Sequence, residues 1–198
     1  GIGQALCLQL AQRDCQLIVA GPNPRKVDQL ATNLEQAGSA PPLMYPVDQS
    51  GATAEDYDRM ADAIERECGR LDGVVHLAGQ FSGLTPLMQI GADAWQKAFA
   101  VNVHSAQWIN QSCRPLLKKA QGTIVFALED PELIGQAFWG AYGASKGALV
   151  KLAEITREEL EAEGIRVIGW QPGPTLTRIR KSAFVEDHAQ PQSAESAA

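Results

Sequence analysis

Residues 122–128, GTIVFAL, and residues 164–170, GIRVIGW, are two short apolar runs on either side of a helical segment at 141–163. Short, mostly apolar runs of this length are typical of buried strands. In the segment between them, apolar side chains recur at helical spacing: Ala144, Ala148, Leu149, Leu152 and Ala153. This order of strand, helix and strand predicts two parallel strands joined by a crossover helix.

The same alternation runs through the rest of the chain. Further apolar runs with strand character lie at 15–21, 42–47 and 71–79. Helical stretches separate them, at 3–13, 24–37, 54–68 and 93–119. Uniformly apolar strands separated by helices predict an α/β fold with a doubly wound parallel sheet, covered by helices on both faces. Such sheets bind ligands beyond the carboxyl ends of their strands, where the strand order reverses.

Composition narrows the class of protein. A chain of 198 residues that is 45% hydrophobic suits one globular domain of ordinary size. The net charge of −6 argues against a nucleic-acid surface, and no apolar run approaches the ~20 residues that span a bilayer. The cysteines and histidines are scattered, without metal-ligand spacing: Cys7, Cys15, Cys68, Cys113, His76, His104 and His188. We therefore predict no metal site and a reducing, cytoplasmic location.

The two ends of the chain differ from a complete sheet of this kind. Gly1-Ile2-Gly3 runs straight into a helix, and glycines there let backbone amides approach a pyrophosphate. Taken alone, the glycines fit a flexible terminus better, but the strand–helix alternation that follows favours the second half of a dinucleotide-binding turn. From residue 185 onward the chain is rich in Glu, Gln, Ser, Ala and Pro. We expect a dinucleotide-binding and catalytic domain over 1–184 and a flexible polar tail over 185–198.

On this interpretation the sheet lacks its first and last strands in this chain. The strands that end near Ala20 and Leu77 would otherwise leave buried edges unpaired, at a large cost in lost hydrogen bonds. We therefore expect the natural protein to extend beyond both ends of the sequence.

Tyr142 and Lys146 lie four residues apart on the predicted helix 141–163, so their side chains share one face. A nearby cation favours the phenolate and lowers the pKa of a tyrosine from its usual value near ~10. Tyr142 is thus a candidate proton donor or acceptor. Such pairs also occur by chance on solvated helices, so the surrounding motifs decide the interpretation.

From Gly1 to about Phe184, these motifs together resemble the short-chain dehydrogenase/reductase family. Gly1, Ile2 and Gly3 look like the end of the family's glycine-rich turn, and Asp48 matches the aspartate that hydrogen-bonds the adenine amine. HLAG (76–79) stands where the family has Asn-Asn-Ala-Gly. Further cofactor contacts implied by the resemblance are Ala78, Gly79, Lys146, Pro172, Gly173 and Thr177.

The resemblance also implies a mechanism. Tyr142 would exchange a proton with the substrate oxygen, while Lys146 would bind the nicotinamide ribose and lower the pKa of Tyr142. Asn102 matches the asparagine that holds a water in the proton relay. The family's helices corresponding to 93–119 and 141–163 pack against a second copy, which implies a homodimer or homotetramer.

Glu129 is the main departure from the family pattern. It stands thirteen residues before Tyr142, where the family has a serine that hydrogen-bonds the substrate oxygen. A carboxylate there would repel that oxygen and raise the pKa of Tyr142. A protonated Glu129 could instead donate the missing hydrogen bond, or the side chain could turn to solvent and leave the site damaged.

The choice of cofactor rests on few residues. Pro22 stands where related sequences often have the arginine that binds the 2′-phosphate of NADP. The aspartate that binds the ribose of NAD is also missing from this strand end. Arg25 and Lys26 could bind a phosphate or form the solvated start of a helix. We favour NADP over NAD.

Two functions follow from the sequence. We favour an NAD(P)-dependent oxidoreductase that acts on a small carbonyl or alcohol, with turnover impaired by Glu129. The alternative is a non-catalytic protein that keeps the fold for nucleotide binding or assembly.

Overall fold

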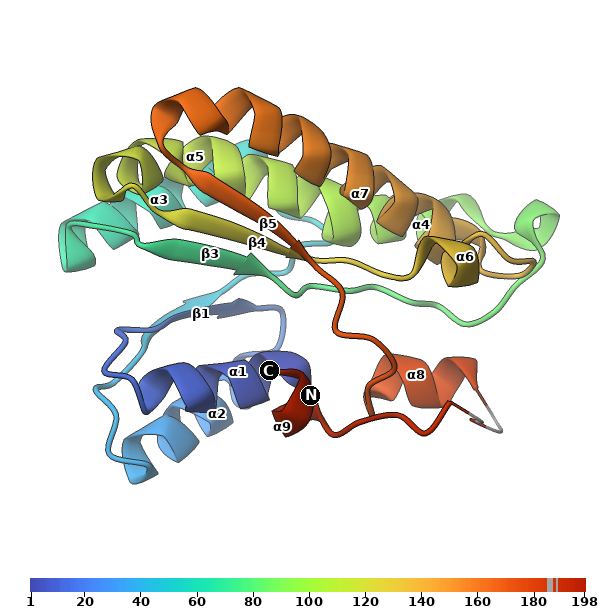
Figure 1. Ribbon diagram of the computed structural model, residues 1–198, viewed down its shortest axis with the longest axis horizontal. Coiled ribbons are helices and arrows are strands. Elements are labelled where there is room, and N and C mark those ends of the chain that lie inside the picture. The colour runs from blue at the N-terminus through green and yellow to red at the C-terminus, as the bar shows by residue number, and fades with distance from the viewer. Residues whose placement is uncertain (185–186, 188) are drawn as a thin grey trace. The chain divides into compact units, whose positions relative to one another are not determined.

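The computed structural model describes residues 1–184, 187 and 189–198 (Figure 1). The chain forms two compact units: residues Gly1–Gln49 with Pro172–Ala198, and residues Ser50–Gln171. The predicted polar tail begins at residue 185, and residues 185, 186 and 188 of it lie outside the described residues.

The first unit contains a pair of parallel strands with helices. Its elements are α1 (Ile2–Ala11), β1 (Ile18–Gly21), α2 (Pro24–Gln36), β2 (Leu43–Pro46), α8 (Arg178–Ala183) and α9 (Ala194–Ala197). Strands β1 and β2 pair in register from Ile18 opposite Leu43. Helix α2 has a typical start, with Asn23 accepting a hydrogen bond from the Lys26 amide at 3.2 Å and proline in the first position.

The end of the chain is held within this first unit. The backbone amide of Leu176 donates to the Gln192 carbonyl at 2.9 Å, and the Gln192 side chain donates to the Pro172 carbonyl at 2.6 Å. Helix α9 also contacts α1, since the Gln9 side chain donates to the Glu195 carbonyl at 2.8 Å. These bonds fix the described part of residues 189–198 beside the loop that follows residue 171.

The second unit is built on a three-stranded parallel sheet in the order β3 (Gly73–His76), β4 (Thr123–Ala127) and β5 (Arg166–Trp170). Figure 1 shows its long helices against one face of this sheet. The helical elements are α3 (Ala54–Cys68), η1 (Leu87–Gln89), α4 (Ala92–Phe99), η2 (Ala100–His104), α5 (Ser105–Ala120), α6 (Pro131–Ile134), α7 (Gly140–Leu160) and η3 (Glu161–Glu163).

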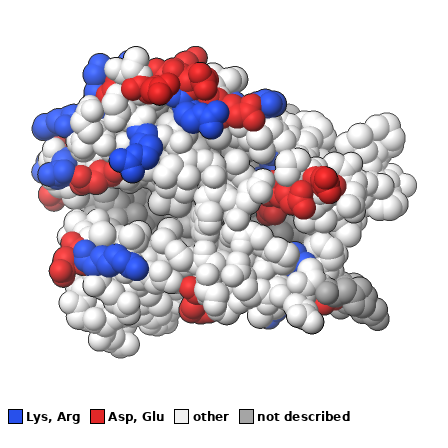
Figure 2. Space-filling view, in the orientation of Figure 1, with Lys and Arg blue, Asp and Glu red and all other residues white. Residues whose placement is uncertain are grey.

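The core of the second unit lies between the central strand and the helices. Ile124 and Phe126 of β4 are fully buried, as are Leu117 of α5 and Leu149 of α7. Burying each such side chain contributes about 1.5–3 kcal/mol to folding. Over these helices, Figure 2 shows acidic and basic side chains interspersed on the visible face. Among the described residues, none of the helices is long and apolar enough to cross a membrane.

All of the predicted strands are present, each shorter than its apolar run. The prediction of one continuous helix over 93–119 is wrong, because a π-helical turn, η2, interrupts it at Ala100–His104. Such turns place a side chain where a regular helix would not, and they are frequent at functional sites. The residue that this turn presents is Asn102.

Candidate active site

Helix α7 positions the tyrosine and the lysine. It begins at Gly140, whose φ of +45° is a left-handed conformation that suits glycine, and a Cβ there would lie 2.3 Å from Ile90 Cδ1. Tyr142 and Lys146 follow on one face of the helix and are only 4% and 6% exposed. The Lys146 Nζ lies 6.0 Å from the centre of the Tyr142 ring. The chain therefore buries a phenol and an ammonium in the same place.

The Tyr142 hydroxyl forms a hydrogen bond with the carboxylate of Glu129. It donates to Oε1 of Glu129 at 2.6 Å, a short distance that fits a bond to a charged acceptor. Burial first, and then the charge and hydrogen bond of Glu129, raise the pKa of Tyr142 above its ordinary value. This direction is opposite to the one expected from Lys146 alone. Glu129 thus points at Tyr142 rather than to solvent.

The Lys146 side chain forms a hydrogen bond with the end of the central strand, β4. Its Nζ donates to the carbonyl of Ala127, the last residue of β4, at 2.8 Å. Burial lowers the pKa of Lys146, and the charge of Glu129 opposes that shift. The ammonium is therefore held beside the strand end from which Glu129 also projects.

Asn102 connects the π turn to its surroundings. Its Oδ1 accepts from the Gln80 amide at 2.7 Å, and its Nδ2 donates to the Gln80 carbonyl at 3.2 Å and to Ser145 Oγ at 2.8 Å. Ser145 Oγ in turn donates to the Tyr142 carbonyl at 2.9 Å. Both amide hydrogens of Asn102 are thus used within the protein, and the side chain fixes α7 against the segment after β3.

Ser145 and Gln80 were not among the site residues predicted from the sequence. Ser145 is fully buried directly before Lys146, and a small polar residue next to a candidate lysine was the available signal. Gln80 gave no signal, because it contributes its backbone amide and carbonyl rather than its side chain.

His76, at the end of β3, is a core residue. Its Nε2 lies 2.7 Å from Asn110 Oδ1, and its ring packs 4.9 Å from that of Phe126. Burial lowers the pKa of His76 to about 4, so the ring is neutral at pH 7. Ala78 and Gly79 follow it on the segment that leads to Gln80. In the described part of the chain, no group of three or more His, Cys, Asp and Glu side chains could hold a metal ion.

The other candidate cofactor residues belong to the first unit. Gly1 is the N-cap of α1, which begins with Ile2 and Gly3, and Asp48 follows β2. Pro172, Gly173 and Thr177 lie in the loop before α8. Thr177 caps that helix by accepting a hydrogen bond from the Arg180 amide at 3.2 Å. In the second unit, the structure brings together Asn102, Glu129, Tyr142 and Lys146.

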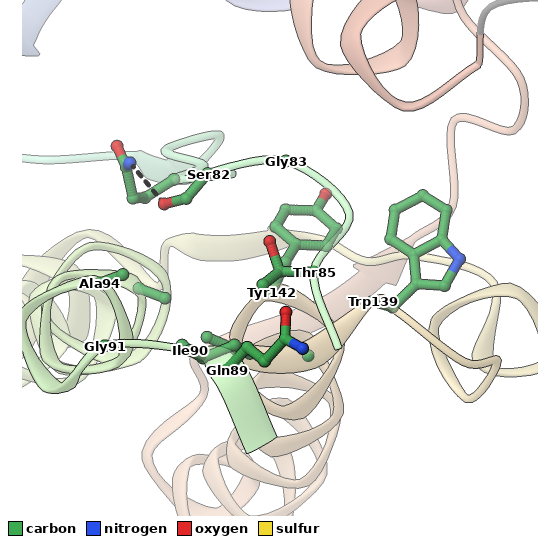
Figure 3. A pocket seen from close by; sticks show the side chains of 13 residues that line it. Ser82, Gly83, Thr85, Gln89, Ile90, Gly91, Ala94, Trp139 and Tyr142 are labelled. Atoms are coloured by element: carbon green, nitrogen blue, oxygen red, sulfur yellow. Dashed lines mark hydrogen bonds between the residues drawn. The ribbon is translucent and has the colours of Figure 1, made fainter. Parts of the chain in front are cut away.

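A cavity of about 220 Å³ opens beside Tyr142. Figure 3 shows side chains from the segment after β3, from α4 and from the start of α7 around it. Trp139 lines this cavity and is also 7% exposed, so it serves both packing and the cavity wall. The proton-bearing tyrosine therefore forms part of the wall of a hollow that a small molecule can enter.

Comparison with known proteins identifies the class to which this site belongs. The family model for short chain dehydrogenase matches residues 1–188, so the chain belongs to the short-chain dehydrogenase/reductase family and is an enzyme of that family. It is 31% identical over 191 residues to the uncharacterized oxidoreductase YciK of Escherichia coli, covering 96% of this chain and 75% of that protein. It is 33% identical over 153 residues to the 2,3-dihydro-2,3-dihydroxybenzoate dehydrogenase of E. coli, covering 75% and 61%.

Solved structures agree with this class. A short chain dehydrogenase from Shigella flexneri complexed with NADP superposes with a TM-score of 0.92 at 30% identity, over 98% of this chain and 82% of that one. One from E. coli CFT073 complexed with NADPH gives 0.91 at 32% identity, over 98% and 81%. The Rossmann-like fold class predicted from the sequence is confirmed.

Proposed function

We propose that this enzyme is an NADP-dependent oxidoreductase that interconverts small carbonyl compounds and alcohols. The observation that carries the proposal is the buried pair of Tyr142 and Lys146 on one face of α7, with the Tyr142 ring in the wall of a cavity. Solved relatives bound to NADP and NADPH support the choice of cofactor. Arg25 and Lys26, at the start of α2, are the cations we assign to the 2′-phosphate.

The residues present fit a dinucleotide. Helix α1 has no side-chain cap, and a Cβ at Gly1 would meet nothing within 4 Å. Its first amides are donors of the kind that bind a phosphate. In the second unit, the Lys146 ammonium has three donors and gives one to Ala127, which leaves two for ribose hydroxyls. We assign Asp48 to the adenine amine, and assign contacts to the cofactor to Ile2, Gly3, Ala78, Gly79, Pro172, Gly173 and Thr177.

The proton chemistry then follows from the side chains. When bound, the nicotinamide supplies or accepts the hydride. Tyr142 would donate its proton to the carbonyl oxygen during reduction and take a proton from the alcohol during oxidation. Lys146 would favour the phenolate by its positive charge. Asn102 would keep α7, and so both side chains, in position.

Glu129 makes this site slower than a site with serine. The substrate oxygen must compete with the carboxylate for the Tyr142 hydroxyl, and it lacks the second donor that a serine would supply. Losing one such donor costs on the order of 10²–10³ in rate. We therefore propose an enzyme with impaired turnover.

One observation favours a second candidate function. Because the Tyr142 hydroxyl already donates its hydrogen bond to Glu129 and the pKa of Tyr142 is raised, the site could bind a nucleotide without chemistry. Titration with NADPH and with NADH, followed by nicotinamide fluorescence, tests the binding that both functions share. The proposed NADP-dependent oxidoreductase would bind NADPH more tightly than NADH and consume it with a carbonyl compound. Binding without consumption, in the natural protein and in a Glu129→Ser variant, would leave the non-catalytic function.

We also propose a cytoplasmic homodimer or homotetramer. The unpaired, scattered cysteines support a reducing compartment. Ile155 of α7 is 55% exposed, and we assign this side chain to the contact with a second copy.

A further inference from the structure

The residues found to line the cavity beside Tyr142 carry no charge. Within the part of the chain that the structure describes, they include no Asp, Glu, Lys or Arg: Gln80, Ser82, Gly83, Thr85, Gln89, Ile90, Gly91, Ala94, Ala98, Trp139, Gly140, Ala141 and Tyr142. The acidic group nearest the reacting hydroxyl is Glu129, at 2.6 Å from it. A carboxylate in this cavity would lose its hydration without gaining a cation, and such burial is costly.

One wall of the cavity is aromatic. Trp139 and Tyr142 line it, and Phe81 packs against both without being a lining residue: its ring meets that of Tyr142 edge-on at 5.3 Å and lies 5.7 Å from that of Trp139. Trp139 and Tyr142 are 5.9 Å apart. Aromatic pairs at these separations attract one another beyond simple burial, so a flat ring in the substrate has matching partners here.

The opposite wall limits the size of the occupant. Ala94 and Ala98 come from one face of α4, and Ile90 packs so closely on Gly140 that no Cβ fits there. The resulting volume of about 220 Å³ is smaller than the roughly 300–1,000 Å³ common for ligand pockets. A compound with one ring fits this space better than one with several.

Exposed apolar side chains lie next to the cavity-lining residues in sequence. Leu84, Leu87, Met88 and Phe138 are each about half exposed or more, and the Thr85 amide joins their two segments through the Phe138 carbonyl at 2.9 Å. Figure 2 shows the projecting segment 83–90, on the right, without acidic or basic side chains. These flanking segments therefore present apolar side chains on the surface.

We propose that this cavity selects uncharged, single-ring ketones and the corresponding alcohols, and discriminates against carboxylated ones. The inference rests on the proposed function for the role of Tyr142, which would meet the substrate oxygen while the ring lies against Trp139. Size is set by the α4 wall, and charge by the absence of a cation from the lining residues.

The test compares two probes of similar shape, acetophenone and 4-acetylbenzoate, which differ by one carboxylate. Binding to the full chain is measured by ligand-observed NMR, with and without NADPH. We expect acetophenone to bind about ten-fold or more tightly than 4-acetylbenzoate, because only the latter carries a charge to be desolvated. Equal affinities, or a preference for 4-acetylbenzoate, would overturn the proposal.

Variants place the probe in this cavity. Ala94→Leu fills the α4 wall and should weaken acetophenone binding by about ten-fold or more, since overpacking excludes the ring. Ala92→Leu, on the exposed start of the same helix and outside the lining, is the matched control and should leave binding unchanged. Equal effects of the two variants would contradict the assignment.

A second variant reverses the selectivity without filling the space. Gln89 lines the cavity from an exposed position, so Gln89→Lys adds a cation at little structural risk. It should tighten 4-acetylbenzoate binding by about ten-fold relative to acetophenone binding, because only the carboxylate gains a partner. No gain for 4-acetylbenzoate in a folded Gln89→Lys protein would count against the proposal.

Consumption of NADPH, measured separately, distinguishes this inference from the proposed function. Selective, Ala94-dependent binding of acetophenone without reduction would leave the cavity assignment standing and remove the oxidoreductase. Reduction of both probes at equal efficiency would support the oxidoreductase function and overturn the proposed selectivity of the cavity.

Discussion

Replacing Glu129 by serine should speed the reaction. In the structure the Tyr142 hydroxyl donates to Glu129 Oε1 at 2.6 Å, and this bond must break before the proton can reach a substrate. A hydrogen bond to a charged group is worth about 1.5–3 kcal/mol net, which corresponds to roughly 10- to 100-fold in rate. Serine removes that competitor and offers a donor to the substrate oxygen. We expect kcat/KM for acetophenone reduction with NADPH to rise about ten-fold or more.

The same substitution should change the pH dependence. Burial and Glu129 together raise the pKa of Tyr142, and Glu129→Ser removes the contribution of Glu129 while burial remains. In alcohol oxidation Tyr142 acts as the base, so the rate increases with pH as Tyr142 loses its proton. Because the variant lowers the pKa of Tyr142, we expect this increase to begin at lower pH than in the natural protein.

Three variants control the experiment. Glu129→Gln removes the charge but keeps an acceptor, so it separates repulsion from the missing donor. Glu132→Ser makes the same chemical change at an exposed residue of α6 and should have no effect. Tyr142→Phe combined with Glu129→Ser should abolish the gain. Unchanged or lower activity of Glu129→Ser, with NADPH binding intact, would refute the reasoning and make Glu129 a working or irrelevant residue.

Two further predictions concern stability and assembly. Because burial lowers the pKa of His76 from 6.5 to about 4, the unfolded chain binds a proton there before the folded one does, so stability is complete above about pH 6.5 and falls toward pH 4. Urea unfolding should show that the free energy of unfolding decreases from pH 7 to pH 4.5. This decrease should be smaller in His76→Gln than in the natural protein, by up to about 3 kcal/mol. Equal decreases in the two proteins would contradict the burial argument. Light scattering at micromolar concentration should show a dimer or tetramer, reduced by Ile155→Glu but not by Arg157→Glu, which is exposed two residues further on and so lies on a different face of α7. A monomer before substitution would refute the assembly.

The regular elements could be predicted from the sequence because their signals are local. Strands such as β4 are unbroken apolar runs, and α7 shows helical spacing of small and apolar residues. The π turn at Ala100–His104 could not be predicted, because it accompanies bonds from Asn102 to the backbone of Gln80, far away in sequence. Helix α6 was missed although Asp130 and Pro131 are a typical helix start, because its four residues carry no periodic signal.

The candidate site was predictable in its composition but not in its bonds. Spacing alone placed Tyr142 and Lys146 on one face of a helix. It could not show that Lys146 donates to the Ala127 carbonyl while Tyr142 donates to Glu129, because both contacts depend on how the end of β4 meets α7. The cavity depends on packing between α4, α7 and the segment after β3, and no single stretch of sequence records it.

The central claim is that Tyr142 supplies the proton in a reaction that moves hydride between NADPH and a carbonyl compound. The most direct measurement is transfer of deuterium from 4-deuterated NADPH to acetophenone, detected by mass spectrometry of the alcohol, which remains sensitive when turnover is slow. We expect deuterated alcohol from the natural protein, more of it from Glu129→Ser, and none above background from Tyr142→Phe. Absence of deuterated alcohol from both the natural protein and Glu129→Ser, or its undiminished formation by Tyr142→Phe, would contradict the claim.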